Sequence, residues 1–132
     1  MPHVAFVGAE TPDEMPLPLC GVPVDVILVD ASDEVSQKTG DPMIKLQLKV
    51  HAPDADYDGM VVYDYLTNPE TSQRTKIAAK KIGRAFGLSD ADMSKGVDFP
   101  DFIGKDLQVV LAKKAATEQY PEGRNVKAYV PA

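Results

Sequence analysis

Residues 44–50 alternate strictly between apolar and polar side chains, and this alternation constrains the fold more than any other stretch of the chain. The apolar side chains would share one face of a strand: Ile44, Leu46, Leu48 and Val50. The polar side chains would share the other face: Lys45, Gln47 and Lys49. A period of two is typical of a strand with one buried and one solvent-facing side. With the Gly/Pro turn that carries Lys38 before it, the strand predicts a sheet with a cationic outer face, which suits a polyanionic ligand.

The rest of the chain predicts four further strands and one helix. The predicted strands, besides the one above, cover residues 22–30, 60–66, 105–113 and 125–130. The polar segment 33–42 is expected to be the turn between the first two strands. Thr71 or Ser72 is expected to cap a helix that runs to about Phe86 and ends at Gly87.

Three strands, a helix and two more strands is the element order of the OB-fold, a small Greek-key barrel. Alternating strands also favour antiparallel pairing over the continuous apolar runs of a parallel sheet. We therefore expect an all-β domain with one helix. It would be a five-stranded OB-fold Greek-key barrel over residues 21–132, with its helix between strands three and four. Residues 1–20, rich in Pro and acids, are expected to form an extended N-terminal arm.

The charge is distributed unevenly along the 132 residues, whose net charge is −6. Residues 1–34 hold seven acids and no Lys or Arg, so that the remaining residues hold 13 acids and 14 bases. Because the acidity is concentrated at the N-terminal end, the composition permits a basic groove elsewhere without requiring one.

The apolar runs, the first residues and the single cysteine predict the compartment of the protein and whether it enters a membrane. The apolar runs are too short to span a bilayer, and the first residues lack the pattern of a secretory signal, so we expect no membrane and a cytoplasmic location. The single cysteine, Cys20, excludes an internal disulfide and fits a reducing compartment. We expect it to be a small buried side chain rather than a reactive thiol.

Several short motifs occur in an order and spacing that resemble a known family. They are Leu19-Cys-Gly-Val22, Lys38-Thr-Gly-Asp-Pro-Met-Ile-Lys-Leu46, Gly59 with Val62-Tyr-Asp-Tyr-Leu66, Ala85-Phe-Gly-Leu88, Ile103-Gly-Lys105 and Asn125-Val-Lys-Ala-Tyr129. No single motif is specific. Taken together, over residues 18–131, the chain resembles the small phage-encoded single-stranded-DNA-binding proteins with an OB-fold, a family long described as a phage domain of unknown function.

The resemblance implies a protein that coats single strands during phage DNA replication or recombination, in the cytoplasm of a bacterial host. Members of this family often carry an acidic C-terminal tail that recruits partners. This sequence ends in Tyr129-Val-Pro-Ala132 instead, so the acidic N-terminal arm is the candidate for contacts with replication or recombination proteins.

A protein that binds single strands without sequence preference needs cations along the backbone path and aromatic faces for the bases. Tyr63 and Tyr65 are the candidate stacking residues if Val62 and Leu66 point inward, whereas the opposite register would bury both tyrosines. The ligand face of an OB-fold comprises strands two and three with the first and last inter-strand loops. The candidate polar contacts there are Lys38, Lys45, Gln47, Lys49, Lys113, Lys114, Arg124 and Lys127.

Three features of the sequence have less certain roles. Tyr120 and Tyr129 are weaker candidates for stacking. Asp64 on strand three would be costly if buried alone, so we expect it to pair with a nearby base or loop amide. The helix carries five bases and no acid: Arg74, Lys76, Lys80, Lys81 and Arg84. We interpret most of these as a solvated face, with an extended electrostatic path or a second strand-binding segment as the alternative.

No motif points to an enzyme. His3 and His51 are far apart and lack metal-ligand spacing, and no triad, P-loop or nucleophile elbow is present. We expect no catalytic residues, no metal and no cofactor. The alternative function is an OB-fold protein-interaction module, such as a virion or replisome adaptor or an inhibitor of a host enzyme. DNA versus RNA and the oligomeric state, a dimer included, stay open.

Overall fold

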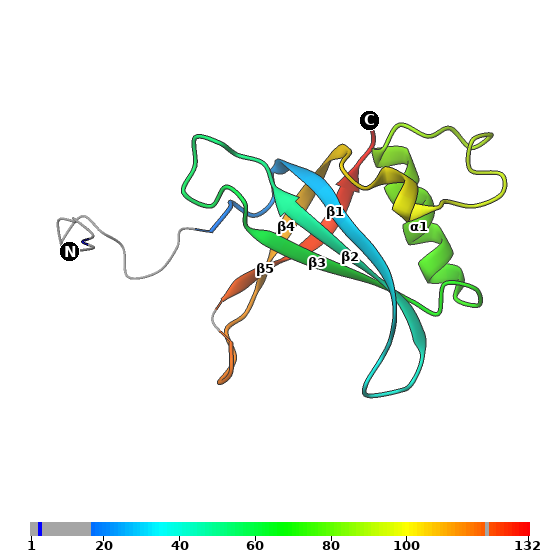
Figure 1. Ribbon diagram of the computed structural model, residues 1–132, viewed down its shortest axis with the longest axis horizontal. Helices are drawn as coiled ribbons and strands as arrows, with labels where there is room; N and C mark the ends of the chain where they lie inside the picture. The colour runs from blue at the N-terminus through cyan, green and yellow to red at the C-terminus, as the bar shows by residue number, and fades with distance from the viewer. Residues whose placement is uncertain (1–2, 4–16, 121) are drawn as a thin grey trace.

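The computed structural model describes His3 and residues 17–120 and 122–132. In these residues five antiparallel strands form one sheet of order β3-β2-β1-β4-β5, and one α-helix lies at an end of the sheet (Figure 1). The elements are β1 (Pro23–Val35), β2 (Pro42–Val50), β3 (Val61–Thr67), α1 (Gln73–Ala85), a 3-10 turn (Phe99–Phe102), β4 (Asp106–Lys114) and β5 (Gly123–Val130). The expectation of a mostly β domain with one helix is confirmed. Most of the predicted arm, residues 1–20, lies outside the described residues.

Strand β1 is longer than the sequence pattern predicts. Its first part, Pro23–Ile27, pairs with β4, and the part from Val26 onward pairs with β2 up to Val35. The register with β2 shifts between Leu28 and Asp30. This bulge breaks the alternation of side chains, which explains why residues 33–35 were predicted to belong to the turn although they lie in the strand. The turn that remains, residues 36–41, is closed by hydrogen bonds between Ser36 and Asp41 and between Gly40 and Ser36.

The core lies between the inner face of the sheet and the helix. Its buried apolar residues come from β1, β2, β3, β4, α1 and the 3-10 turn: Val26, Leu28, Leu46, Leu48, Val50, Val62, Leu66, Ile82, Ala85, Phe99, Leu107, Val109 and Leu111. The apolar positions of residues 44–50 are thus the buried ones or pack against the core, as their alternation predicts. Burial of the inner face fixes which side chains of β2 and β3 point outward.

The helix begins and ends with the expected signals. The hydroxyl of Ser72 accepts a hydrogen bond from the backbone N–H of Thr75, and Gly87 has a φ of +90° just after the last turn. The N–H of Leu88 donates to the carbonyl of Gly83, the bond typical of a Schellman motif. Near the same end, the N–H of Ala132 donates to the carbonyl of Arg84 and holds the last residue of the sequence against the helix.

The segment before β1 differs from expectation at Cys20. The N–H of Gly21, with a φ of +80°, donates to the carbonyl of Leu111 and turns the chain at the start of the sheet. Pro18 is buried, whereas Leu19 and Cys20 are exposed. The expected burial of Cys20 is therefore wrong, because this turn directs its side chain to solvent.

Strands β3 and β5 lie side by side but are not joined by backbone hydrogen bonds. The chain of antiparallel pairings makes the two strands run in the same direction. They are linked by a side-chain contact, in which the hydroxyl of Tyr129 donates to Oδ2 of Asp64 at 2.6 Å. We call this line of approach the β3–β5 seam. The sheet curls back on itself without closing.

Burial and the neighbouring Asp64 carboxylate raise the pKa of the Tyr129 phenol well above its usual value of 10.0. The raised pKa means that the unfolded chain loses this proton at a lower pH than the folded chain. The contribution of Tyr129 to stability is therefore complete below about pH 10 and is lost as the pH rises from there toward the pKa of the folded state.

Replacing Tyr129 by Phe should lower the free energy of unfolding by about 1–3 kcal/mol at neutral pH, because a half-buried carboxylate loses its donor. The difference from wild type should narrow above about pH 10. Urea unfolding at a series of pH values measures both effects. Tyr65→Phe, an exposed residue on β3, is the matched control and should change stability by less than about 0.5 kcal/mol. Equal losses in the two variants would contradict a specific role for the Tyr129–Asp64 bond.

Candidate nucleic-acid interface

Strand β3 presents two tyrosines on the outer face of the sheet. Val62 and Leu66 point into the core, while 43% of Tyr63 and 48% of Tyr65 is exposed. The predicted register, with Val62 and Leu66 inward, is confirmed. Packing of the apolar pair against the core leaves the rings of the other two residues on the solvent side. The structure thus provides two neighbouring flat aromatic faces that no core contact requires.

The polar side chains of β2 lie directly beside these rings. In the register between the strands, Lys45 is opposite Tyr65 and Gln47 is opposite Tyr63. The ammonium group of Lys45 lies 4.6 Å from the centre of the Tyr63 ring, within range of a cation–π interaction. Lys49 is exposed further along the same face. The predicted set of Lys45, Gln47, Lys49 and the two tyrosines is therefore brought together.

A hollow of about 600 Å³ lies beside the tyrosines, where β3 faces β5 and the β4–β5 loop. Tyr63 and Tyr65 line one side of it, and Lys114 and Tyr120 line the other. Both Lys114 and Tyr120 are exposed. Tyr120 was only a weak sequence candidate, because its place in a polar loop gives no periodic signal. Its ring extends the set of aromatic faces from the sheet to the loop.

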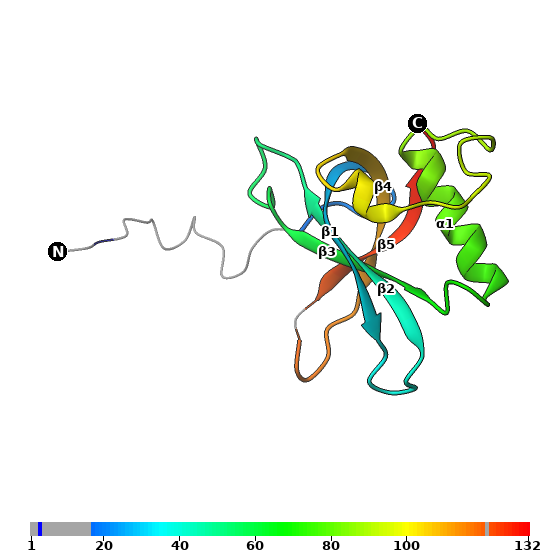
Figure 2. The same ribbon diagram turned by 45° about the vertical axis from the view of Figure 1, so that its right-hand side comes forward.

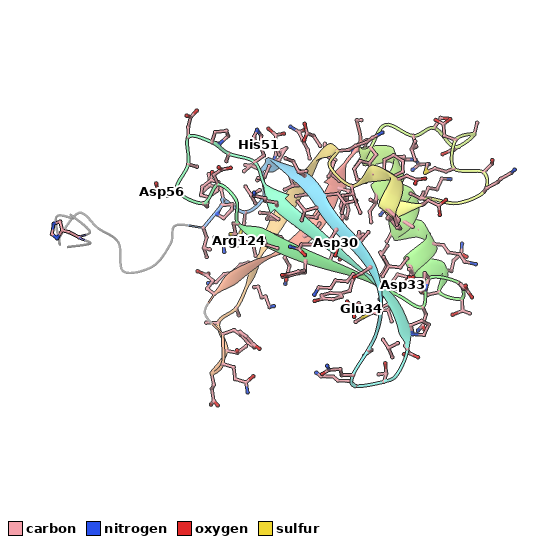
Figure 3. The ribbon with its side chains drawn as sticks, in the orientation of Figure 1. Asp30, Asp33, Glu34, His51, Asp56 and Arg124 are labelled. Carbon is pink, nitrogen blue, oxygen red and sulfur yellow. The ribbon has the colours of Figure 1, made fainter. Side chains whose placement is uncertain are left out.

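Two predicted cations of the β4–β5 hairpin are already engaged. The Nε of Arg124 donates to the carbonyl of Pro18 at 2.7 Å, its Nη1 donates to the carbonyl of Gly123, and only 12% of its side chain is exposed. Figure 3 shows Arg124 on the β5 side of the sheet, near the start of the described chain. Lys113 forms an ion pair of 3.2 Å with Glu122. Arg124 thus supports the fold, and Lys113 is partly neutralised.

The remaining two predicted residues lie away from the tyrosines. Lys38 is exposed in the turn after β1, and this turn and the β4–β5 loop extend from the same side of the sheet in both views (Figures 1 and 2). Lys127 is exposed on β5 but faces the helix. The predicted set is therefore divided between the outer face, the two loops and the α1–β5 side.

The outer face is not uniformly basic, because acids occupy its β1 side. Asp30 pairs with Gln47 in the sheet register and Glu34 pairs with Met43, and both acids are exposed. Figure 3 shows Asp30, Asp33 and Glu34 along this strand. The described residues form no ion pair between these acids and Lys45 or Lys49. The β1 side of the face is thus acidic, while the side toward β3 and the seam carries the tyrosines, Lys45 and Lys114, together with Glu122, which pairs with Lys113.

Asp64 has partners of a different kind from those expected. One oxygen accepts from the backbone N–H of Tyr65 and the other accepts from the Tyr129 hydroxyl. Tyr129 is therefore part of the seam and not a free stacking face. The sequence gives no sign of this pairing, because the two residues lie 65 positions apart and meet only when the sheet curls.

Within the described part of the chain, no group of three or more His, Cys, Asp or Glu side chains is arranged to hold a metal ion. No helix there has the length and apolar character needed to cross a membrane. The chain matches no protein-family model, and no curated protein is significantly similar to it in sequence.

Replacing Arg124 by Met should lower the free energy of unfolding by about 1–3 kcal/mol, because the Pro18 carbonyl loses a charged donor. Lys113→Met removes the same charge from an exposed ion pair and should cost less than about 1 kcal/mol. Urea unfolding at neutral pH compares the two variants. A stability of Arg124→Met equal to that of Lys113→Met would show that the Pro18 contact is not a structural anchor.

Proposed function

We propose that this protein is a single-stranded DNA-binding protein of the OB-fold type, largely without sequence preference and without enzymatic activity. The observation that carries the proposal is the pair of exposed rings at Tyr63 and Tyr65 with Lys45 and Lys49 beside them. Bases stack on such rings whatever their identity, and the ammonium groups meet the phosphates. The resemblance to phage single-stranded-DNA-binding proteins adds the proposed setting, phage replication or recombination in a bacterial cytoplasm.

The arrangement of the strands supports the OB-fold as the finer description. Strand β1 pairs with both β2 and β4, β3 and β5 lie side by side, and the helix connects β3 to β4. An OB-fold is a partly open barrel that binds its ligand on strands two and three and on the β1–β2 and β4–β5 loops. Lys38 and Lys114 belong to those loops or adjoin them, so the proposed path runs from one loop to the other across the tyrosines.

The salt dependence of binding to fluorescently labelled oligo-dT tests the proposal. A path that engages about five phosphates predicts a log–log slope of about −3.5 between binding constant and salt concentration. The same slope with a ribo-oligonucleotide would extend the ligand class to RNA. Absence of salt-sensitive binding at low ionic strength would reject the proposed function.

The tyrosines should act through their rings and not through their hydroxyls. Changing Tyr63 or Tyr65 to Ala should weaken binding by about 5- to 150-fold, which corresponds to about 1–3 kcal/mol per stacked base, at an unchanged salt slope. The matched Phe variants keep the ring and should bind within about threefold of wild type. Fluorescence anisotropy with oligo-dT measures all four variants. If the Ala variants bind as well as the Phe variants, stacking on β3 is wrong.

The acids on β1 favour a second candidate, a protein-interaction module. Exposed Asp30, Asp33 and Glu34 could meet a basic partner protein, such as a component of a virion or replisome or a host enzyme. The two functions predict different results when proteins bound from a host lysate are recovered after nuclease treatment. Partners that remain bound after digestion of nucleic acid, together with no affinity of the purified protein for oligo-dT, would favour this candidate.

A further inference from the structure

A second hollow, of about 540 Å³, lies between α1 and β5 on the side of the seam away from the β4–β5 loop. Its lining combines cations with an apolar floor. The cations are Arg74, Lys81, Arg84 and Lys127, and the apolar residues are Ile77, Ala78, Val126, Ala128 and Pro131. Ile77 is 49% exposed although it lies on a helix that packs against the core. We call this feature the α1–β5 hollow.

Three cations of the α1–β5 hollow have no acidic partner among the described residues. The ion pairs of the helix join Lys80 and Arg84 to Asp90, and the Arg84 guanidinium and the Lys80 charge lower the pKa of that carboxyl. Arg74, Lys81 and Lys127 take part in no ion pair in the described chain, and all three are exposed. Helix α1 itself contains no acid. Among the described residues, the hollow therefore holds three cations without an ion-pair partner around an apolar floor.

The α1–β5 hollow adjoins the hollow beside the tyrosines. Asp64 and Val126 line both, one from β3 and one from β5. Among the described residues that line the α1–β5 hollow, Asp64 is the only acid, and its two oxygens already accept hydrogen bonds from Tyr65 and Tyr129. A flexible strand lying on Tyr63 and Tyr65 can thus pass over the seam and reach the helix without leaving the protein surface.

The charges on the outer face favour this direction over the opposite one. Toward β1 a strand would meet Asp30 and Glu34, whereas along the seam toward the helix it meets the three cations of the α1–β5 hollow. Lys114 and Glu122 line the opposite end of the seam, near the β4–β5 loop. The acidic side chains repel the phosphates of a nucleic-acid strand, whereas the series of Lys and Arg side chains attracts them. The apolar floor, with Ile77 exposed, suits the face of a base or a sugar.

We infer that the α1–β5 hollow is a second contact site for the same polynucleotide, held through phosphates by Arg74, Lys81 and Lys127. The inference rests on the proposed function. The strand would cross the β3–β5 seam, so the footprint of the protein would include the helix side as well as the outer face of β2 and β3. A short oligonucleotide would occupy the outer face alone, and a longer one would fill both sites.

The test compares oligo-dT of about 5 and about 15 nucleotides, lengths within the range bound by single OB-folds. Wild type should bind the longer oligomer with a steeper salt slope. The triple variant Arg74→Gln, Lys81→Gln, Lys127→Gln should reduce that slope by about 2, and the affinity for the longer oligomer at about 50 mM salt by at least about tenfold. Binding of the shorter oligomer should stay within about threefold of wild type.

A matched control keeps the change in net charge but moves it elsewhere. Lys76→Gln, Lys95→Gln and Lys105→Gln remove three exposed cations that do not line the α1–β5 hollow. This control should bind both oligomers like wild type, to within about threefold. If wild type binds both lengths and the two triple variants behave alike, the second site is wrong while the proposed function stands. If wild type binds neither length, the proposed function fails and the second site fails with it.

NMR spectra of the amide groups locate the contact independently of affinity. The longer oligomer should shift the amides of residues 77–81 and 126–128, and the shorter one should shift those of β2 and β3 only. If the short and the long oligomer shift the same amides equally, the strand does not fill the outer face before the α1–β5 hollow, and the inference is contradicted. If a poly-glutamate peptide shifts the helix amides and oligo-dT does not, the hollow is a protein-docking site and the inference is overturned.

Discussion

Strand β1 holds the two halves of the sheet together, because it pairs with β2 on one edge and with β4 on the other. Val26 and Ile27 have partners on both sides at once, and the bulge after Leu28 lies where the pairing with β4 ends. Increased twist at a bulge lets a single sheet curve around its core. The curvature brings β3 and β5, the two outer strands, side by side. The hollow beside the tyrosines and the α1–β5 hollow both lie where they meet.

The distribution of charge on the outer face follows from the same curvature. Acids from β1 lie on one half of the face, and the tyrosines and free cations lie toward β3, β5 and the helix. The negative net charge of the chain therefore does not by itself exclude a polyanionic ligand, because the exposed acids of β1 and the cations of the α1–β5 hollow lie in different places. A polyanion would be guided along one side of the molecule and repelled from the other. This segregation gives a binding path a direction that a uniformly basic face would lack.

Much of the fold could be predicted from sequence because its signals are local. The alternation in residues 44–50 gave the buried face of β2, and Ser72 and Gly87 marked the limits of the helix. The extension of β1 to Val35 was missed because a bulge breaks the periodicity on which such a prediction depends. The outward position of Tyr63 and Tyr65 followed from the two apolar residues that flank them, Val62 and Leu66.

The site was less predictable, because contacts between distant segments decide it. The anchoring of Arg124 by Pro18 and the bond from Tyr129 to Asp64 join residues that are 106 and 65 positions apart. No pattern in one stretch of sequence reports such a pairing. The position of Lys127 on the helix side of β5 likewise depends on how far the sheet curls. Residue type correctly suggested cations and aromatic rings, but only the tertiary arrangement shows which are free and which are occupied.

The β3–β5 seam differs from the other contacts between neighbouring strands of the sheet. Elsewhere in the sheet, neighbouring strands are joined by ladders of backbone hydrogen bonds. In the described residues, β3 and β5 are joined instead by one side-chain hydrogen bond, from the Tyr129 hydroxyl to Asp64. Val126 and Tyr129 of β5 also pack against the core at this place. The distance between β3 and β5 is therefore set by side-chain packing and by this hydrogen bond, not by a backbone ladder.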